Sequence, residues 1–436
     1  MDPTSRVGRP TAEPTSRAAG TTKVRDRSPS IPPVPLRSIL FTLSGFLAAT
    51  SLPAPIDAQA QLPPPDASAW TIASQPLMVI GGLEADANGE FAAIVDVVRG
   101  PDGTFAIVDA MLSSISFHSP DGALIAVTGR RGEGPGEFRR ITGALADPQG
   151  RLFVFDQGHQ RITEFTFDGT RVGDTRLTRG AADRRIGGVG RFPHGSWYAW
   201  EADQMLASGF DELARDTVGY YRFADGEVGE LLGRVPGRVS TEFKVFLGGP
   251  AIRHALYSPR PLGVGWGECL LVGTSDVPEL RILDGTGADV GTLSLETTAE
   301  PTTREHRDQW ASSTVADAGD EAGFLQRMLV RSTGRRVRMA ERVPFAHTVI
   351  VDDLGYIWAQ RFRPPEGEGG AEWQVFTETG AMAGTVTLHD RFRVMEISSD
   401  EIVGVQTGGL GEEEVRVYAL DRGADVDRRP LPLACE

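Results

Sequence analysis

The chain has 436 residues, of which 40% are hydrophobic and 24% charged, a balance typical of a globular protein with a substantial core. Its formal net charge of −15 repels phosphate backbones, so we expect no nucleic-acid partner. The 52 glycines and 29 prolines favour a chain of many tight turns over a helical protein.

The start of the chain has the pattern of an export signal. Residues 1–36 are rich in Pro, Ser, Thr and Arg without apolar periodicity, which predicts a disordered leader. Residues 37–60 combine Arg37, an apolar run and a small-x-small sequence, as in a secretory signal peptide. A leader before such a signal indicates a start codon assigned too far upstream, and an uncleaved anchor is the alternative. We expect a periplasmic or extracellular protein with no membrane span after signal removal.

Residues 61–69 form a linker rich in Pro and Asp, and short strand patterns follow from Trp70 onward. The segment 89–109 recurs at 136–156: in each copy, Gly-Glu-Phe precedes an isoleucine, a Gly-containing turn and a hydrophobic strand that ends in Asp. Corresponding positions, such as Phe91 and Phe138, are 47 residues apart. A fixed period filled with alternating strands and Gly/Asp turns is typical of β-propeller blades.

The same pattern predicts six blades along the chain, at about 91–129, 138–177, 185–223, 256–295, 345–388 and 394–420. The last blade is one strand short, and an isolated strand pattern at 70–80 is surplus. Pairing the two closes the ring and removes exposed sheet edges. The expected fold class is all-β, a six-bladed β-propeller over 70–425 closed by an N-terminal strand, with 426–436 as a C-terminal tail. Seven blades are the alternative, if residues 201–255 contain another.

Two segments interrupt the strand pattern. Residues 203–217 predict a short helical insertion. Residues at about 301–342 predict a longer one between blades four and five, because Thr303-Arg304-Glu305 fits a helix start and an apolar stripe follows at Phe324, Leu325, Met328 and Leu329. We expect the longer insertion to pack over a face or rim of the propeller, as padding or as a lid over one mouth of the channel.

Blade two carries a resemblance to a known repeat. Its sequence GRRGEGPGEF at 129–138, a Val-x-Asp strand ending at Asp156 and an Arg-Ile strand at Arg161 resemble the NHL repeat. The chain is thus similar to bacterial exported six-bladed propellers, a group named for shape. Asp276 and Arg281 repeat the spacing of Asp156 and Arg161 in blade four. We interpret each Asp and Arg as an ion pair that locks a hairpin, because carboxylate–guanidinium pairs are geometrically specific.

Basic side chains gather where the predicted blades enter the centre of the ring, and equivalent positions of a propeller converge on one mouth of its channel. The candidates are Arg139, Arg140, Arg184, Arg185, Arg253, His254 and His347. An electropositive mouth on an acidic protein would concentrate carboxylates, acidic peptides or acidic sugars. The alternative is that these are solvated rim residues or partners of acids such as Glu90 and Glu137.

A catalytic alternative follows from the resemblance, because sugar lactonases share six-bladed propellers and hold a divalent cation such as calcium with Glu, Asn and Asp oxygens. This chain has a single asparagine, Asn88, in a turn before the first repeat, so that ligand set is missing. Asp96 and Asp352 are the remaining candidate ligands. A zinc site would need several channel histidines, for which His254 and His347 are the candidates.

The two cysteines, Cys269 and Cys435, are too few for a disulfide scaffold and lack metal-ligand spacing. Either they pair and tie the tail to a blade, or Cys269 is a small buried hydrophobe.

The sequence therefore predicts an exported, monomeric, non-catalytic binding or assembly module. It would recognise a protein, peptide or glycan through its loop face or channel mouth, without a cofactor. A metal-dependent lactonase-type hydrolase or lyase in the channel is the alternative. The two differ in that an enzyme must gather polar groups inside the channel, and the fold alone does not decide between them.

Overall fold

The computed structural model describes residues 68–82, 90–192, 195–206, 212–244, 250–316, 337–363, 369–423, 430–431 and 435. The predicted leader, the signal peptide, most of the linker and the apolar stripe at 324–329 lie outside these residues. Among the described residues, no helical segment has the length and apolar character of a membrane span.

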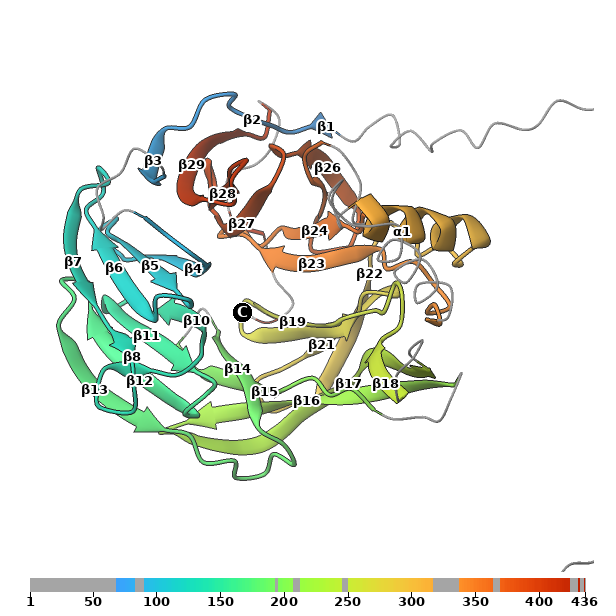
Figure 1. The fold of residues 1–436 in the computed structure, drawn as a ribbon, viewed down its shortest axis with the longest axis horizontal. Coiled ribbons are helices and arrows are strands. Elements are labelled where there is room, and N and C mark those ends of the chain that lie inside the picture. The colour runs from blue at the N-terminus through green and yellow to red at the C-terminus, as the bar shows by residue number, and fades with distance from the viewer. Residues whose placement is uncertain are drawn as a thin grey trace, which may run out of the picture. The chain divides into compact units, whose positions relative to one another are not determined.

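Six sheets surround one axis and form a six-bladed β-propeller, which confirms the predicted fold class (Figure 1). Blade one contains β4 (Ile94–Arg99), β5 (Phe105–Asp109), β6 (Ser114–His118) and β7 (Leu124–Thr128). Blade two contains β10 (Ile141–Ala146), β11 (Arg151–Asp156), β12 (Arg161–Thr166) and β13 (Arg171–Arg176). Blade three contains β14 (Ile186–Arg191), β15 (Trp197–Glu201), β16 (Leu213–Ala224), β17 (Glu227–Lys244) and β18 (Pro250–His254).

The second half of the ring has the same order. Blade four contains β19 (Pro261–Trp266), β20 (Cys269–Thr274), β21 (Val277–Leu283) and β22 (Asp289–Ser294). Blade five contains β23 (Ala346–Val351), β24 (Ile357–Arg361), β25 (Glu372–Phe376), β26 (Met382–Thr387) and the added strand β1 (Ser68–Ala69). Blade six contains β27 (Phe392–Ile397), β28 (Glu401–Thr407), β29 (Glu413–Asp421) and the added strands β2 (Thr71–Ile72) and β3 (Met78–Gly81). A short parallel pair connects blades one and two, β8 (Arg130–Arg131) with β9 (Glu137–Phe138).

The predicted repeat turns form because glycine is placed where the backbone needs a positive φ. Gly103 and Gly150 have φ of 84° and 78°, a conformation that residues with a Cβ rarely adopt. Each closes a turn through its N–H, Gly103 to the Gly100 carbonyl at 2.9 Å and Gly150 to the Asp147 carbonyl at 3.1 Å. These turns fix the first hairpins of blades one and two in register.

The first strand of every blade lies nearest the centre of the ring (Figure 1). Among these strands, β4 contacts β10 and β27, and β14 contacts β10 and β19. These inner strands are β4, β10, β14, β19, β23 and β27. Because each blade repeats one up-and-down order, the inner strands begin at one mouth of the channel and end at the other. We call the mouth where they begin the entry mouth.

The N-terminal strands close the ring, as the sequence predicts. β2 and β3 both pair with β29, so blade six gains the strand that it lacks. β1 in addition pairs with β26 in parallel, which attaches the same segment to blade five. This second attachment was not predicted from the sequence. The N-terminal segment therefore connects two neighbouring blades.

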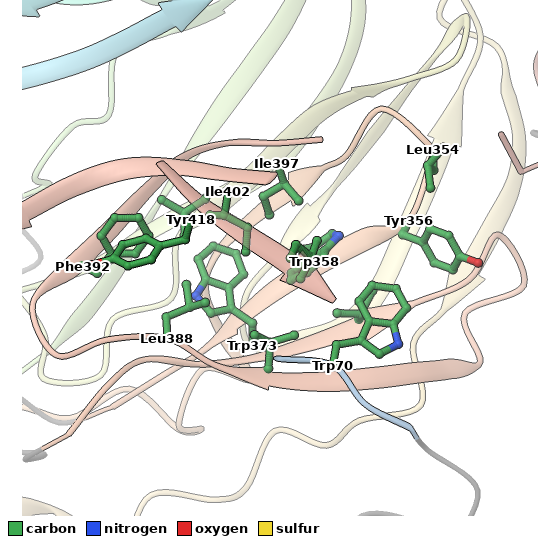
Figure 2. Packing of buried hydrophobic residues seen from close by; sticks show 14 residues of the cluster. Trp70, Leu354, Tyr356, Trp358, Trp373, Leu388, Phe392, Ile397, Ile402 and Tyr418 are labelled. Atoms are coloured by element: carbon green, nitrogen blue, oxygen red, sulfur yellow. The ribbon is translucent and has the colours of Figure 1, made fainter. Parts of the chain in front are cut away.

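Trp70, between β1 and β2, anchors this segment in a buried cluster (Figure 2). Its ring centroid lies 5.4 Å from that of Tyr356 and 5.4 Å from that of Trp358. The guanidinium of Arg422, directly after β29, lies 4.8 Å above the Trp70 ring and is fully buried. It forms an ion pair with Asp352 at 2.8 Å. Side chains from both ends of the propeller thus meet at blade five.

The C-terminal tail contacts the turns at the other mouth of the channel. The N–H of Leu431 donates to the Leu354 carbonyl at 2.8 Å, in the turn that follows β23. Cys435 forms a disulfide with Cys269, the first residue of β20, with Cα atoms 5.5 Å apart. The tail is therefore tied to blades four and five, which decides the alternative that the sequence left open.

The prediction of a helix over 203–217 is wrong, because β16 begins at Leu213. Ala214, Asp216 and Val218 turn inward while the residues between them are exposed, which is the alternation of a strand. Residues 227–244 and 250–254 extend blade three as β17 and β18, so these described residues form no seventh blade. In the longer insertion, α1 (Arg304–Ala316) follows blade four, and helix is present there as predicted.

Candidate functional site

One sequence position recurs around the entry mouth, the residue directly before each inner strand. It is arginine in four of the six blades and Ala93 or Phe345 in the other two. All four arginine residues are exposed: Arg140, Arg185, Arg260 and Arg391. Because the inner strands begin at the same mouth, these positions form a ring of positive charge, which we call the arginine ring.

The acids of the repeat hold the backbone of this position. Asp156 accepts the N–H groups of Arg139 at 2.8 Å and of Arg140 at 2.9 Å. Asp109 holds blade one in the same way, accepting the N–H groups of Ala92 at 2.6 Å and Ala93 at 3.1 Å. The carboxylate at the end of the second strand therefore fixes where the inner strand starts.

The predicted pairing of these acids with the following arginine is wrong in both repeats. Arg161 lies opposite Asp156 in the ladder but donates to the carbonyls of Gly134, at 3.2 Å, and Glu137. In blade four, Asp276 and Arg281 have separate partners, Arg215 at 2.9 Å and Asp289 at 3.6 Å respectively. Asp156 is held by nearby backbone N–H groups, and Asp276 pairs with Arg215 of β16. Lying opposite each other in the sheet is therefore not sufficient for an Asp and an Arg to form an ion pair.

The predicted mouth residues of blades two and three divide into two kinds. Arg139, Arg140 and Arg185 are exposed, and Arg185 also donates to the Gln157 carbonyl at 2.6 Å. Arg184 is different, because its guanidinium donates to both oxygens of the Asp216 carboxylate, at 2.8 and 2.7 Å. It also reaches the buried Glu201 at 3.2 Å. Arg184 thus neutralises two buried acids of blade three and is not a free cation of the mouth.

Arg253 and His254 end β18, so they belong to blade three and not to blade four as predicted. The long hairpin of β17 and β18 places His254 in a cluster with Asp203, Arg238, Arg260 and His347, which we call the histidine cluster. His254 Nε2 lies 3.9 Å from Asp203 Oδ2, and Arg238 Nε lies 3.7 Å from the same oxygen. Arg260 belongs both to this cluster and to the arginine ring.

The two histidines of the cluster are neutral at pH 7. Burial and the charges of Arg238 and Arg260 lower the pKa of His254 to about 4, and they lower the pKa of His347 to about 4. The same positive charges oppose the binding of a zinc ion by these imidazoles. Among the described residues, no group of three metal-ligating side chains comes together.

A cavity of about 1000 Å³ opens at the entry mouth beside blades five and six. The described residues that line it include one carboxylate, Asp390, and four arginines: Arg260, Arg363, Arg391 and Arg393. His347 also lines it and so connects the cavity to the histidine cluster. The lining is net positive in an otherwise acidic protein, although Arg393 also pairs with Glu413 at 3.4 Å and Arg391 Nε lies 3.9 Å from Asp390.

Sequence reasoning missed all four arginines of the cavity. Arg260 and Arg391 share the position of Arg140, one residue before the inner strand, so that position was a usable signal. It was hidden because blade four was expected to start at Leu256 and blade six at Val394, several residues from the true strand starts.

The candidate metal ligands Asp96 and Asp352 are not brought together, because they lie in blades one and five. Asp352 accepts from Trp358 Nε1 at 2.8 Å and from two backbone N–H groups, and it is paired with Arg422. Asp96 accepts the N–H of Ala144 at 2.9 Å, and burial raises its pKa to about 6. The structure thus gives Asp352 a structural role and leaves the metal hypothesis a prediction.

No protein-family model and no curated protein sequence matches the chain, so the NHL resemblance stays a prediction. The structure is similar to a Bacteroides fragilis protein provisionally described as exported, at 9% identity over 82% of this chain and 99% of that one, with a TM-score of 0.44. It is also similar to a member of the duf4221 family from Bacteroides vulgatus (8% identity, 81% and 98% coverage, TM-score 0.46). A third similar structure is virginiamycin B lyase from Staphylococcus aureus (10% identity, 76% and 95% coverage, TM-score 0.38). At such identities the likeness concerns the fold, and no function follows from it.

Proposed function

We propose that this protein is an exported β-propeller that binds a carboxylate-bearing ligand at its entry mouth. The observation that supports this most is the charge of the cavity, which has four arginines and one carboxylate among its described lining residues. The whole chain has a net charge of −15 and therefore repels anions, whereas the local positive charge of the mouth would attract them.

The chemistry of the lining favours carboxylates. A guanidinium offers a planar fork of N–H donors that matches the two oxygens of a carboxylate, and such bonds are about twice as strong as neutral ones. Arg260 and Arg391 are exposed and can be reached by a ligand, although Arg391 also donates to the Gly408 carbonyl at 3.4 Å and lies 3.9 Å from Asp390. A concave site with a few convergent charged groups is typical of ligand pockets.

Export is supported by the disulfide between Cys269 and Cys435, because such bonds persist in oxidising compartments. The predicted signal peptide at 37–60 agrees with this. We therefore place the ligand outside the cytoplasm.

Isothermal titration calorimetry of the chain from residue 61 tests the proposal. Trigalacturonate and tetraglutamate should bind, the methyl ester of trigalacturonate should not, and affinity should fall as salt rises. Arg391→Ala should weaken binding about tenfold or more, because hydrogen bonds to charged groups contribute about 1.5–3 kcal/mol. Arg176→Ala, an exposed arginine on the outermost strand of blade two, is the matched control. Equal binding of the ester, or equal loss in both variants, would contradict the proposal.

A further inference from the structure

A second group of ligand-binding side chains lies beside the cavity, on the hairpin of β17 and β18. In the register of this hairpin, Ser240 lies opposite His254, and Arg238 is two residues before Ser240. Alternation along a strand therefore puts Arg238, Ser240 and His254 on one face of the hairpin. Asp203 faces the same group, within 4 Å of both Arg238 and His254.

Three polar atoms on this face have no hydrogen-bond partner among the described residues. They are Arg238 Nε, Ser240 Oγ and His254 Nδ1. Buried polar atoms are nearly always hydrogen-bonded in folded proteins, so three on one face need an explanation such as bound water or a ligand. The side chains of Arg238 and His254 are 29% and 25% exposed, so a ligand can reach these two, whereas Ser240 is fully buried between the strands.

The chemistry of this face differs from that of the cavity. Arg238 supplies a cation, Asp203 an acceptor, and His254 and Ser240 groups that both donate and accept. A cation with mixed donors and acceptors suits a sugar that carries a carboxylate and hydroxyl groups. An extended acidic peptide offers N–H donors and C=O acceptors only along its backbone, whereas a sugar ring carries hydroxyl groups and a carboxylate close together, which fits this compact group better.

We infer that the face formed by Arg238, Ser240, His254 and Asp203 is a second subsite of the entry mouth, and that the ligand is an acidic oligosaccharide of at least two uronic-acid units. One unit binds in the cavity and the next on the hairpin. The two subsites are neighbours, because Arg260 and His347 line the cavity and the charge of Arg260 acts on His254 of the hairpin face. This inference rests on the proposed function, since it assigns a substrate class to the same mouth.

Calorimetry with galacturonate, digalacturonate and tetraglutamate, on the chain from residue 61, tests the second subsite. Digalacturonate should bind at least a hundredfold more tightly than the monomer. Once its first unit is bound, the second unit is held at a high effective concentration beside the second subsite. Arg238→Gln should remove most of that gain. A circular-dichroism spectrum that matches the wild type shows that the variant is folded.

Each other outcome overturns a distinct part of the account. Equal affinity for monomer and dimer, or a dimer affinity that Arg238→Gln does not alter, removes the second subsite and leaves the proposed function standing. Tighter binding of tetraglutamate than of digalacturonate makes the ligand a peptide and overturns the assignment to sugars. Absence of binding by all three anions refutes the proposed function itself.

Discussion

Replacement of Asp352 by alanine should destabilise the propeller by about 3–5 kcal/mol, the usual cost of removing one partner from a buried ion pair. The carboxylate and the Arg422 guanidinium are both fully buried and lie 2.8 Å apart. Without Asp352, the guanidinium loses its ion-pair partner and keeps only the carbonyls of Ser398 and Ser399 as acceptors, among the rings of Trp70, Tyr356 and Trp358. The variant also leaves Trp358 Nε1 and the N–H of Tyr356 without their acceptor, so the upper end of the range is expected.

Urea unfolding of the chain from residue 61 measures this cost, and two further variants separate its causes. Asp352→Ala combined with Arg422→Met removes the unpaired charge and should recover at least half of the lost stability. Asp289→Ala breaks the exposed pair with Arg281 and should cost less than about 1 kcal/mol. A loss below about 1 kcal/mol for Asp352→Ala, or a double variant less stable than the single one, would refute the reasoning.

The same titrations decide whether Asp352 is a metal ligand. If its role is structural, the stability of the wild type is the same in calcium and in a chelator. A calcium-dependent increase that Asp352→Ala abolishes would instead support the lactonase-type alternative.

Three further predictions concern the closure of the ring and the charge of the mouth. Trp70→Ala should cost about 3–5 kcal/mol in urea unfolding, because it empties a buried site between blades five and six, and a loss under 1 kcal/mol would contradict the anchoring role. Cys435→Ser should cost about 2–5 kcal/mol, because the disulfide closes a loop with a sequence separation of 166, and an unchanged midpoint would show that the tail adds no stability. The pKa of His254 and of His347 is lowered from 6.5 to about 4 in the folded protein. Between these two pH values the unfolded chain therefore binds more protons than the folded one. The protein should lose stability as the pH falls from 6.5 to about 4. An NMR titration of the histidine ring protons checks this, and protonation of either ring above pH 5.5 would be the contrary result.

The architecture could be predicted because its signals are local. Each blade repeats the alternation of hydrophobic and polar residues along its strands and the Gly-containing turns between them. The extra strand pattern at the N-terminus matches the strand that the last blade lacks. The start of β16 was missed because Leu213, Ala214 and Arg215 favour helix and because Asp216 occupies an inward position. Its burial is compensated by Arg184, 32 residues earlier in the chain, and no local pattern shows that contact.

The candidate site was predictable only in part, because it depends on where each inner strand begins. Arg140 follows the Gly-Glu-Phe motif, Arg185 stands at the predicted start of blade three, and both were identified. Arg260 precedes Pro261, in a blade whose entry lacks the Gly-Glu-Phe motif, so its equivalence appears only once the sheets are known. The position of β1 on blade five was likewise beyond the sequence, since two residues carry no hydrophobic pattern.

The most direct test of binding at the entry mouth is the affinity of Arg260→Ala for digalacturonate, measured beside wild type and Arg176→Ala. Arg260 lines the cavity and belongs to the histidine cluster, so its loss should weaken binding more than the loss of any other single arginine of the mouth, by at least tenfold. Arg176→Ala should bind as the wild type does. An affinity unchanged by Arg260→Ala would mean that the ligand binds elsewhere on the propeller.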